Sequence, residues 1–139
     1  MSTTTNKITS PLITQEDAVI HFIQQLDIDM INTLLDEGRT YQDMEKHVFV
    51  RKLGYAFDEF IDSGETLLNC TSGQCDAVKC NFKCSGYSFT VNNSDKHMDL
   101  IIEKDHEDKV LDIYECRFFL CNGMEKRNSY ETRVRIDRE

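Results

Sequence analysis

The chain has 139 residues, an apolar content of 40% and a single proline, which is typical of a folded domain rather than a disordered segment. Its formal net charge of −9 argues against nucleic-acid binding, because phosphate backbones are bound by clustered lysine and arginine. No run of about 18 apolar residues occurs, so we expect no membrane-spanning helix.

The length predicts one domain. We place it at residues 14–121, after a disordered lead at 1–13 and before a tail at 122–139. The first residues, Met1 to Lys7, lack the apolar core of a signal peptide. We therefore expect a cytoplasmic protein whose thiols are reduced.

Residues 14–63 have the periodicity of three helices. Thr14 and Asp27 are suitable N-caps for the first two, and Gly38 stands where a left-handed C-cap is expected after the second. The third helix covers 45–63 and has the clearest apolar stripe, which consists of Phe49, Leu53, Ala56, Phe57 and Phe60.

After Gly64 the apolar residues alternate, which indicates strands. We expect strands at 67–71, 78–84, 87–91, 97–104 and 109–119, with a turn at Ser72-Gly73 and a β-bulge at Ser85-Gly86. A brief strand is expected within 39–44 and an edge strand around 132–136. Helices followed by strands predict an α+β fold, in which the N-terminal helices pack on a bent antiparallel sheet as in a cystatin-like, cone-shaped roll.

This layout resembles the nuclear transport factor 2-like superfamily, the α+β cone that includes ketosteroid isomerases and polyketide cyclases. The resemblance lies in the junction from Leu26 to Leu35 and in the closing segment Asp112-Ile113-Tyr114-Glu115-Cys116. It implies a pocket inside the cone. In the isomerases of this group a carboxylate base faces a tyrosine acid, and no pair of positions in this chain could be matched to that arrangement.

The predicted pocket is apolar, and it suits a small apolar ligand. We expect it to be lined by residues from the third helix and from the sheet, namely Phe49, Leu53, Phe57, Phe89, Ile113 and Arg117. Glu115 is the candidate general base, because burial at the mouth of such a pocket would raise the pKa of its carboxyl group. Tyr41 and His47 are candidates to assist it. The alternative is an ion pair between Glu115 and Arg117, with Tyr41 and His47 on the surface.

The last hairpin, if centred near His106-Glu107, places Asp99 across from Tyr114 and His97 across from Cys116. One face then carries Met98, Leu100, Ile102, Leu111, Ile113, Glu115 and Arg117, and should pack under the helices. The opposite face carries His97, Asp99, Ile101, Glu103, Asp112, Tyr114, Cys116 and Phe118, and should be solvated or form a homodimer interface.

All six cysteines follow the third helix. A zinc site formed by Cys70, Cys75, Cys80 and Cys84 requires a folded loop, since on a regular strand Cys80 and Cys84 would lie about 13 Å apart. A Cys70–Cys75 disulfide and plain reduced thiols are the alternatives. Cys116 or Cys121 could act as a nucleophile only with a nearby histidine such as His97.

No phosphate-binding glycine motif, nucleophile elbow or metalloprotease helix occurs, so no cofactor is expected. The leading hypothesis is a non-catalytic domain that binds an apolar small molecule or a protein partner. The alternatives are an isomerase, dehydratase or cyclase with Glu115 as base, and a structural zinc-binding domain.

Overall fold

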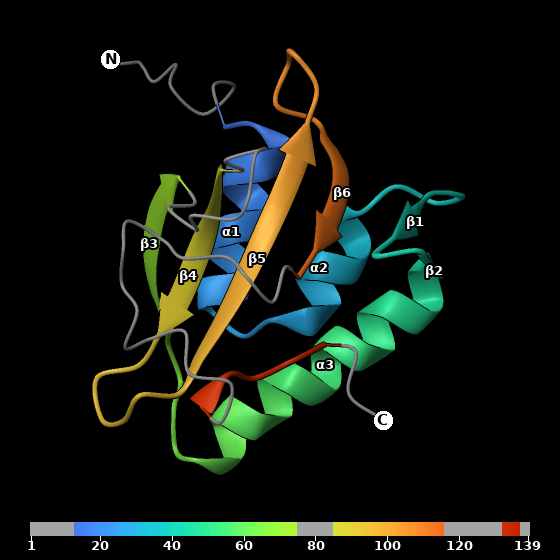
Figure 1. Cartoon of the computed structure of the whole chain (residues 1–139). Helices are drawn as coiled ribbons and strands as arrows, with labels where there is room; N and C mark the ends of the chain where they lie inside the picture. The colour runs from blue at the N-terminus through green and yellow to red at the C-terminus, as the bar shows by residue number, and fades with distance from the viewer. Residues whose placement is uncertain (1–12, 75–84, 116–131, 137–139) are drawn as a thin grey trace, which may run out of the picture.

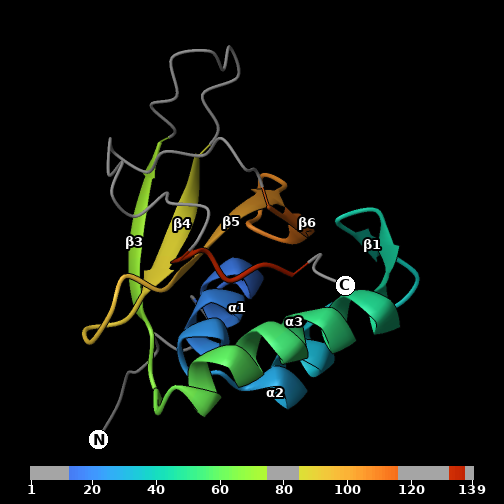
Figure 2. The same ribbon diagram turned by 60° about the horizontal axis from the view of Figure 1, so that its bottom comes forward.

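The computed structural model describes residues 13–74, 85–115 and 132–136. Its helices are α1 (Gln15–Gln24), α2 (Ile28–Leu34) and α3 (Lys46–Asp62). Its strands are β1 (Thr40–Tyr41), β2 (Met44–Glu45), β3 (Asn69–Gln74), β4 (Ser85–Thr90), β5 (His97–Lys104) and β6 (Val110–Tyr114). Within these residues β3-β4-β5-β6 form an antiparallel sheet, and the helices pack on one side of it (Figures 1 and 2). The predicted α+β class is therefore confirmed.

The helix starts follow the sequence signals. The side chains of Thr14 and Asp27 each accept a hydrogen bond at 3.1 Å from the backbone N–H three residues further on, as N-caps do. The second helix ends earlier than predicted, because Leu35 is already extended and Gly38, with φ +79°, lies in the following loop. Gly64 follows α3 with φ +92°, a conformation that glycine adopts without steric cost.

The brief strand expected within 39–44 is a small hairpin of β1 and β2. Its two central residues, Gln42 and Asp43, have φ of 50° and 60°. Positive φ at both central positions is what a tight two-residue hairpin turn needs. Neither residue is glycine, so this turn was not visible in the sequence.

Two local predictions in the sheet are wrong. Ser72 and Gly73 do not turn the chain but continue β3, where they pair with Tyr87 and Gly86. That pairing is regular from Gln74–Ser85 to Asn69–Thr90, so no bulge occurs at Gly86, and the register shift lies instead between Glu103 and Lys104. Small polar residues and glycine fit an extended strand as well as a turn, and here the cross-strand hydrogen bonds favour the strand.

The β5–β6 hairpin forms as predicted, but its register was wrong by two residues. Tyr114 pairs with Ile101 rather than with Asp99, and Ile113 pairs with Ile102. Side chains alternate with a period of two, so this error left Met98, Leu100, Ile102 and Ile113 on the predicted inner face. The register shift next to Lys104 brings Val110 into the core, rather than the predicted Leu111.

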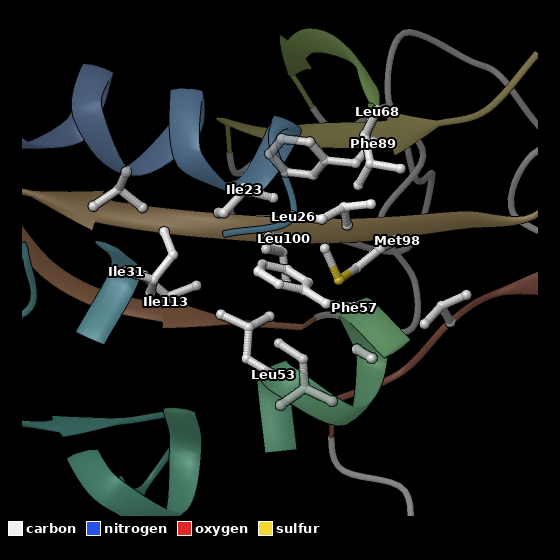
Figure 3. Packing of buried hydrophobic residues seen from close by; sticks show 14 of the residues in the cluster. Ile23, Leu26, Ile31, Leu53, Phe57, Leu68, Phe89, Met98, Leu100 and Ile113 are labelled. Carbon is white, nitrogen blue, oxygen red and sulfur yellow. The ribbon is translucent and has the colours of Figure 1, made fainter. Parts of the chain in front are cut away.

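The core lies between the inner face of the sheet and the helices (Figure 3). Its aromatic rings come mainly from α3 and β4, with Tyr41 from β1, and its aliphatic side chains come from all three helices and from the inner faces of β5 and β6. The fully buried members include Ile23, Ile31, Phe49, Leu53, Phe60, Leu68, Phe89, Met98, Leu100 and Ile113. Among the described residues no helix is long and apolar enough to cross a bilayer.

The outer face, which was expected to be solvated or to form a homodimer interface, is already buried over part of β4 and β5. Ser88, His97, Asp99 and Ile101 are all less than 5% exposed. Asp99 accepts a hydrogen bond from Ser88 Oγ at 2.7 Å, and its Oδ2 lies 3.0 Å from His97 Nδ1 and 3.3 Å from Arg133 Nε. The Asp99 carboxylate thus lies between a hydroxyl donor and the side chains of His97 and Arg133, and charge compensation accompanies the burial of this face.

Arg133 belongs to the C-terminal segment 132–136, which passes between β5 and α3 (Figure 2). It forms a single parallel bridge, between Arg133 and His97, rather than a full edge strand. The backbone N–H of Val134 donates to the carbonyl of His97 at 2.6 Å, and both Val134 and Ile136 are buried in the core.

Candidate functional site

The residues expected to line an apolar pocket form a filled core instead. Phe49, Leu53, Phe57, Phe89 and Ile113 are at most 1% exposed and pack against one another. None of them lines the cavities found among the described residues, which lie at the surface. The sixth residue of this prediction, Arg117, lies outside the described residues, as does Phe118.

Glu115 makes a junction between three segments. Its carboxylate accepts hydrogen bonds from Gln42 Nε2 at 3.2 Å and from the backbone N–H of Ile136 at 2.8 Å. The backbone N–H of Glu115 donates to Gln42 Oε1 at 2.8 Å. Gln42 also donates its backbone N–H to Asp112 Oδ1, at 2.9 Å. These contacts tie the β1–β2 hairpin and the C-terminal segment to the end of β6.

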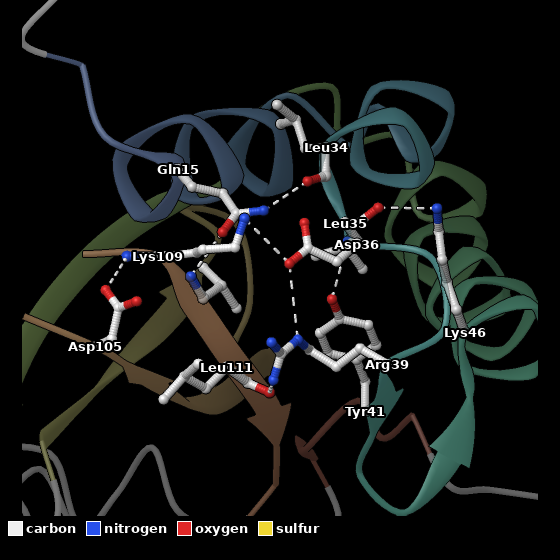
Figure 4. A network of polar contacts seen from close by, with 11 residues as sticks. Gln15, Leu34, Leu35, Asp36, Arg39, Tyr41, Lys46, Asp105, Lys109 and Leu111 are labelled. Carbon is white, nitrogen blue, oxygen red and sulfur yellow. Dashed lines mark hydrogen bonds and ion pairs between the residues drawn. The ribbon is translucent and has the colours of Figure 1, made fainter. Parts of the chain in front are cut away.

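Tyr41 and His47 are directed elsewhere. Tyr41 is fully buried against Phe49, and its hydroxyl oxygen accepts a hydrogen bond at 3.1 Å from the backbone N–H of Asp36 (Figure 4). Burial raises the pKa of the Tyr41 phenol above its ordinary value. His47 is exposed at the start of α3, with Nδ1 3.5 Å from Glu45 Oε1. The polar atoms of Glu115, Tyr41 and His47 thus contact different partners.

The loop after α2 is held by a polar network centred on Asp36 (Figure 4). Asp36 Oδ2 lies 3.2 Å from Lys109 Nζ and 3.7 Å from Arg39 Nε. Gln15 bridges the same region, because its amide donates to Leu34 O at 2.6 Å and accepts from Val110 N at 2.7 Å. This network positions α1 against β6 and explains why the Tyr41 hydroxyl is fixed.

Most of the cysteine predictions fall outside the described residues. Cys70 lies on β3, partly buried on the inner face, whereas Cys75, Cys80, Cys84, Cys116 and Cys121 are not described. Within the described residues no three metal-binding side chains cluster. The zinc site, the Cys70–Cys75 disulfide and the cysteine nucleophile therefore stay predictions.

A different group of residues surrounds a cavity of about 430 Å³ at one end of the sheet. Glu16 in the first turn of α1 meets the inner faces of β3, β4 and β5 there. We call this cavity the Glu16 pocket; it is lined by Glu16, Ser72, Gly73, Gly86, Tyr87, Ile102 and Lys104. Ser72 on β3 pairs with Tyr87 on β4 at the pocket. The backbone N–H of Glu16 donates a hydrogen bond to the backbone oxygen of Asp108 at 3.2 Å, and this bond anchors the start of α1.

The pocket contains a carboxylate, a phenol and an ammonium group in direct contact. Tyr87 Oη donates to Glu16 Oε2 at 2.6 Å, and Lys104 Nζ donates to Glu16 Oε1 at 2.8 Å. The side chain of Glu16 is 7% exposed and that of Lys104 is 41% exposed. Asp108 provides a second carboxylate, whose Oδ1 lies 3.7 Å from Lys104 Nζ.

These contacts fix the protonation states. Burial raises the pKa of the Tyr87 phenol far above its ordinary value, and the hydrogen bond to Glu16 raises it further, so the phenol stays neutral. The hydrogen bond to Glu16 also raises the pKa of Lys104, so its amine stays an ammonium. Tyr87 and Lys104 therefore each keep the proton that they donate to the Glu16 carboxylate.

Sequence reasoning missed this site. It assigned no functional role to Glu16, and Tyr87 and Lys104 entered it only as ends of the predicted strands 87–91 and 97–104. Glu16 is 71 residues from Tyr87 and 88 from Lys104, so their contact depends on how α1 is placed over the sheet. The one available signal was that Tyr87 and Lys104 lie on the inner face.

Comparison of the chain with models of protein families, with curated proteins and with solved structures finds no match in any of the three. The geometry of the Glu16 pocket is therefore the basis for proposing a function.

Proposed function

We propose that the protein is a non-catalytic binding domain that takes a small molecule with an apolar body in the Glu16 pocket. The observation that carries this proposal is that both carboxylate oxygens of Glu16 are already bonded, one to Tyr87 and one to Lys104. A general base must offer its carboxylate to a substrate proton. A carboxylate held by two donors is better suited to orienting a bound ligand.

We also propose that the protein belongs to a branch of the nuclear transport factor 2-like superfamily, which the order of its helices and strands supports. We further propose that it is a cytoplasmic homodimer. The solid core argues against a ligand held deep inside a cone, since Phe49, Phe57 and Phe89 leave it no room. A protein partner is the alternative to a small molecule.

A second candidate function is acid–base catalysis by an isomerase, dehydratase or cyclase. Glu16 and Tyr87, which face one cavity 2.6 Å apart, favour it. In this version Glu16 takes the role that we had expected of Glu115, and Tyr87 is the acid. Catalysis would require a substrate to displace one of the two donors from Glu16.

Binding is tested by recording amide NMR spectra of the full chain while a library of small ring-containing fragments is added. We expect fragments to shift the amides of Ser72, Tyr87, Ile102 and Lys104. Ser72→Trp should fill the pocket and abolish these shifts. Thr71→Trp, one residue away on the opposite face of the same strand, is the matched control. If no fragment shifts the pocket amides, small-molecule binding is wrong.

The two functions are separated by recovering a bound fragment after incubation and weighing it by mass spectrometry. A binding domain returns it unchanged. An enzyme returns an isomer or a dehydrated product, and Glu16→Gln and Tyr87→Phe should each stop that conversion.

A further inference from the structure

We infer that the ligand of the Glu16 pocket is an amine with an apolar body, whose ammonium group takes the place that Lys104 Nζ occupies. This inference rests on the proposed function and names its ligand class. It begins from the cation already present, because Lys104 Nζ lies 2.8 Å from the buried oxygen Glu16 Oε1 at the cavity wall. An ammonium group is thus shown to fit that position.

Lys104 can leave this position at low cost. Its side chain is 41% exposed, and Asp108 Oδ1 lies 3.7 Å from the same nitrogen. An incoming ammonium would take over the hydrogen bond to Glu16, and Lys104 would keep an ion pair with Asp108. No buried charge is then left without a partner, which is the main cost of replacing a partner in a buried pair.

The charge around the pocket favours a cation over an anion. The carboxylates of Glu16, Asp17 and Asp108 act electrostatically on Tyr87 or on Lys104, so three negative groups lie near the one ammonium of Lys104. The whole chain has a net charge of −9, and a field of that sign attracts cations and repels anions. Of the described residues that line the pocket, Lys104 is the cation that could compensate a carboxylate or phosphate ligand, and it is already paired with Glu16.

The rest of the pocket provides apolar surface for the body of the amine. Ile102 and the ring of Tyr87 line it, and an aromatic ring next to a cation adds a favourable electrostatic contact. The cavity of about 430 Å³ lies in the size range of small-molecule sites. A single ring with a short amine-bearing chain fits this description.

The test uses three probes of one shape and different charge: phenethylamine, 2-phenylethanol and phenylacetate. Each is titrated into the full chain while the amide signals of Ser72, Tyr87, Ile102 and Lys104 are followed. We expect phenethylamine to bind most tightly, with an affinity that falls as salt is added, because salt screens charge. Phenylacetate binding more tightly than phenethylamine would overturn the inference.

Substitution of Lys104 should strengthen the binding of a cationic ligand and weaken the binding of an anionic ligand. Lys104→Met removes the competing cation, so phenethylamine should bind about two- to fivefold more tightly, the gain expected from one competing ion pair. At an anion site the same substitution would abolish binding. Glu16→Gln should weaken phenethylamine at least about fivefold. Lys52→Met, which removes a lysine of α3 that does not line the pocket, is the control and should change nothing.

The possible failures can be told apart. If neutral or anionic fragments bind in the pocket and phenethylamine does not, the amine inference is wrong and the proposed binding function stands. If Lys104→Met weakens phenethylamine, the inference is also overturned. If the fragment library leaves every pocket amide unshifted, the binding function itself fails.

Discussion

At the scale of single residues, burial decides which protonation state a side chain keeps. Tyr87 and Tyr41 are both held in the protonated form chiefly because burial disfavours the phenolate. For Tyr87 the ionised neighbour Glu16 adds to this effect. By contrast, Asp105 lies in the β5–β6 turn and accepts hydrogen bonds from the backbone N–H groups of Lys109 and Glu107, which lower its carboxyl pKa.

We predict that Tyr41 ionises above pH 10, the ordinary pKa of tyrosine, and that Tyr87 ionises far above it. Their folded-state pKa lies above the unfolded one, so their contribution to stability is complete below pH 10 and is lost as the pH rises through the folded-state pKa. Ultraviolet titration of tyrosinate should show a late step, which Tyr87→Phe reduces. Tyr55→Phe removes an exposed ring and should leave that step intact.

At the level of secondary-structure elements, helix α3 packs both against the core and against α2. Its apolar stripe packs into the core, while Gly54 on another side faces α2. A Cβ added at Gly54 would lie 3.5 Å from Ile28 Cγ1, which is an ordinary contact. The glycine is therefore not required for α2 and α3 to pack.

Gly54→Ala should stabilise the protein by about 0.5–1 kcal/mol, because glycine in a helix interior loses more backbone entropy on folding than alanine. Gly64→Ala should destabilise it by about 1 kcal/mol, since φ is +92° there and a Cβ is strained. The free energy of unfolding in urea measures both changes. Equal signs for the two substitutions would contradict this account.

At the scale of the whole molecule, Asp99 connects segments that are distant in sequence. It joins β4 through Ser88, β5 through His97 and the C-terminal segment through Arg133. Val134 and Ile136 then complete the core beside α3. Residues 132–136, which lie in the predicted tail, thus contribute buried side chains to the core.

Asp99→Ala should lower the free energy of unfolding by about 3–5 kcal/mol, because it removes the buried carboxylate that Ser88, His97 and Arg133 contact. Asp58→Ala on the exposed side of α3 is the control and should change stability by less than about 0.5 kcal/mol. Chemical denaturation at neutral pH provides the comparison. A loss below about 1 kcal/mol for Asp99→Ala would show that the buried network contributes little.

The starts of the first two helices, with their N-caps, and the inward face of β5 could be predicted from the amino-acid sequence alone. These follow from local periodicity, and a register error of two residues does not disturb them. Cross-strand hydrogen bonds decided that Ser72 and Gly73 continue β3 and that Tyr114 pairs with Ile101. Such hydrogen bonds are not encoded in the local sequence pattern. The same holds for the candidate site. Glu16 meets Tyr87 and Lys104 only because α1 packs over the end of the sheet, and such long-range contacts arise from tertiary packing rather than from residue spacing.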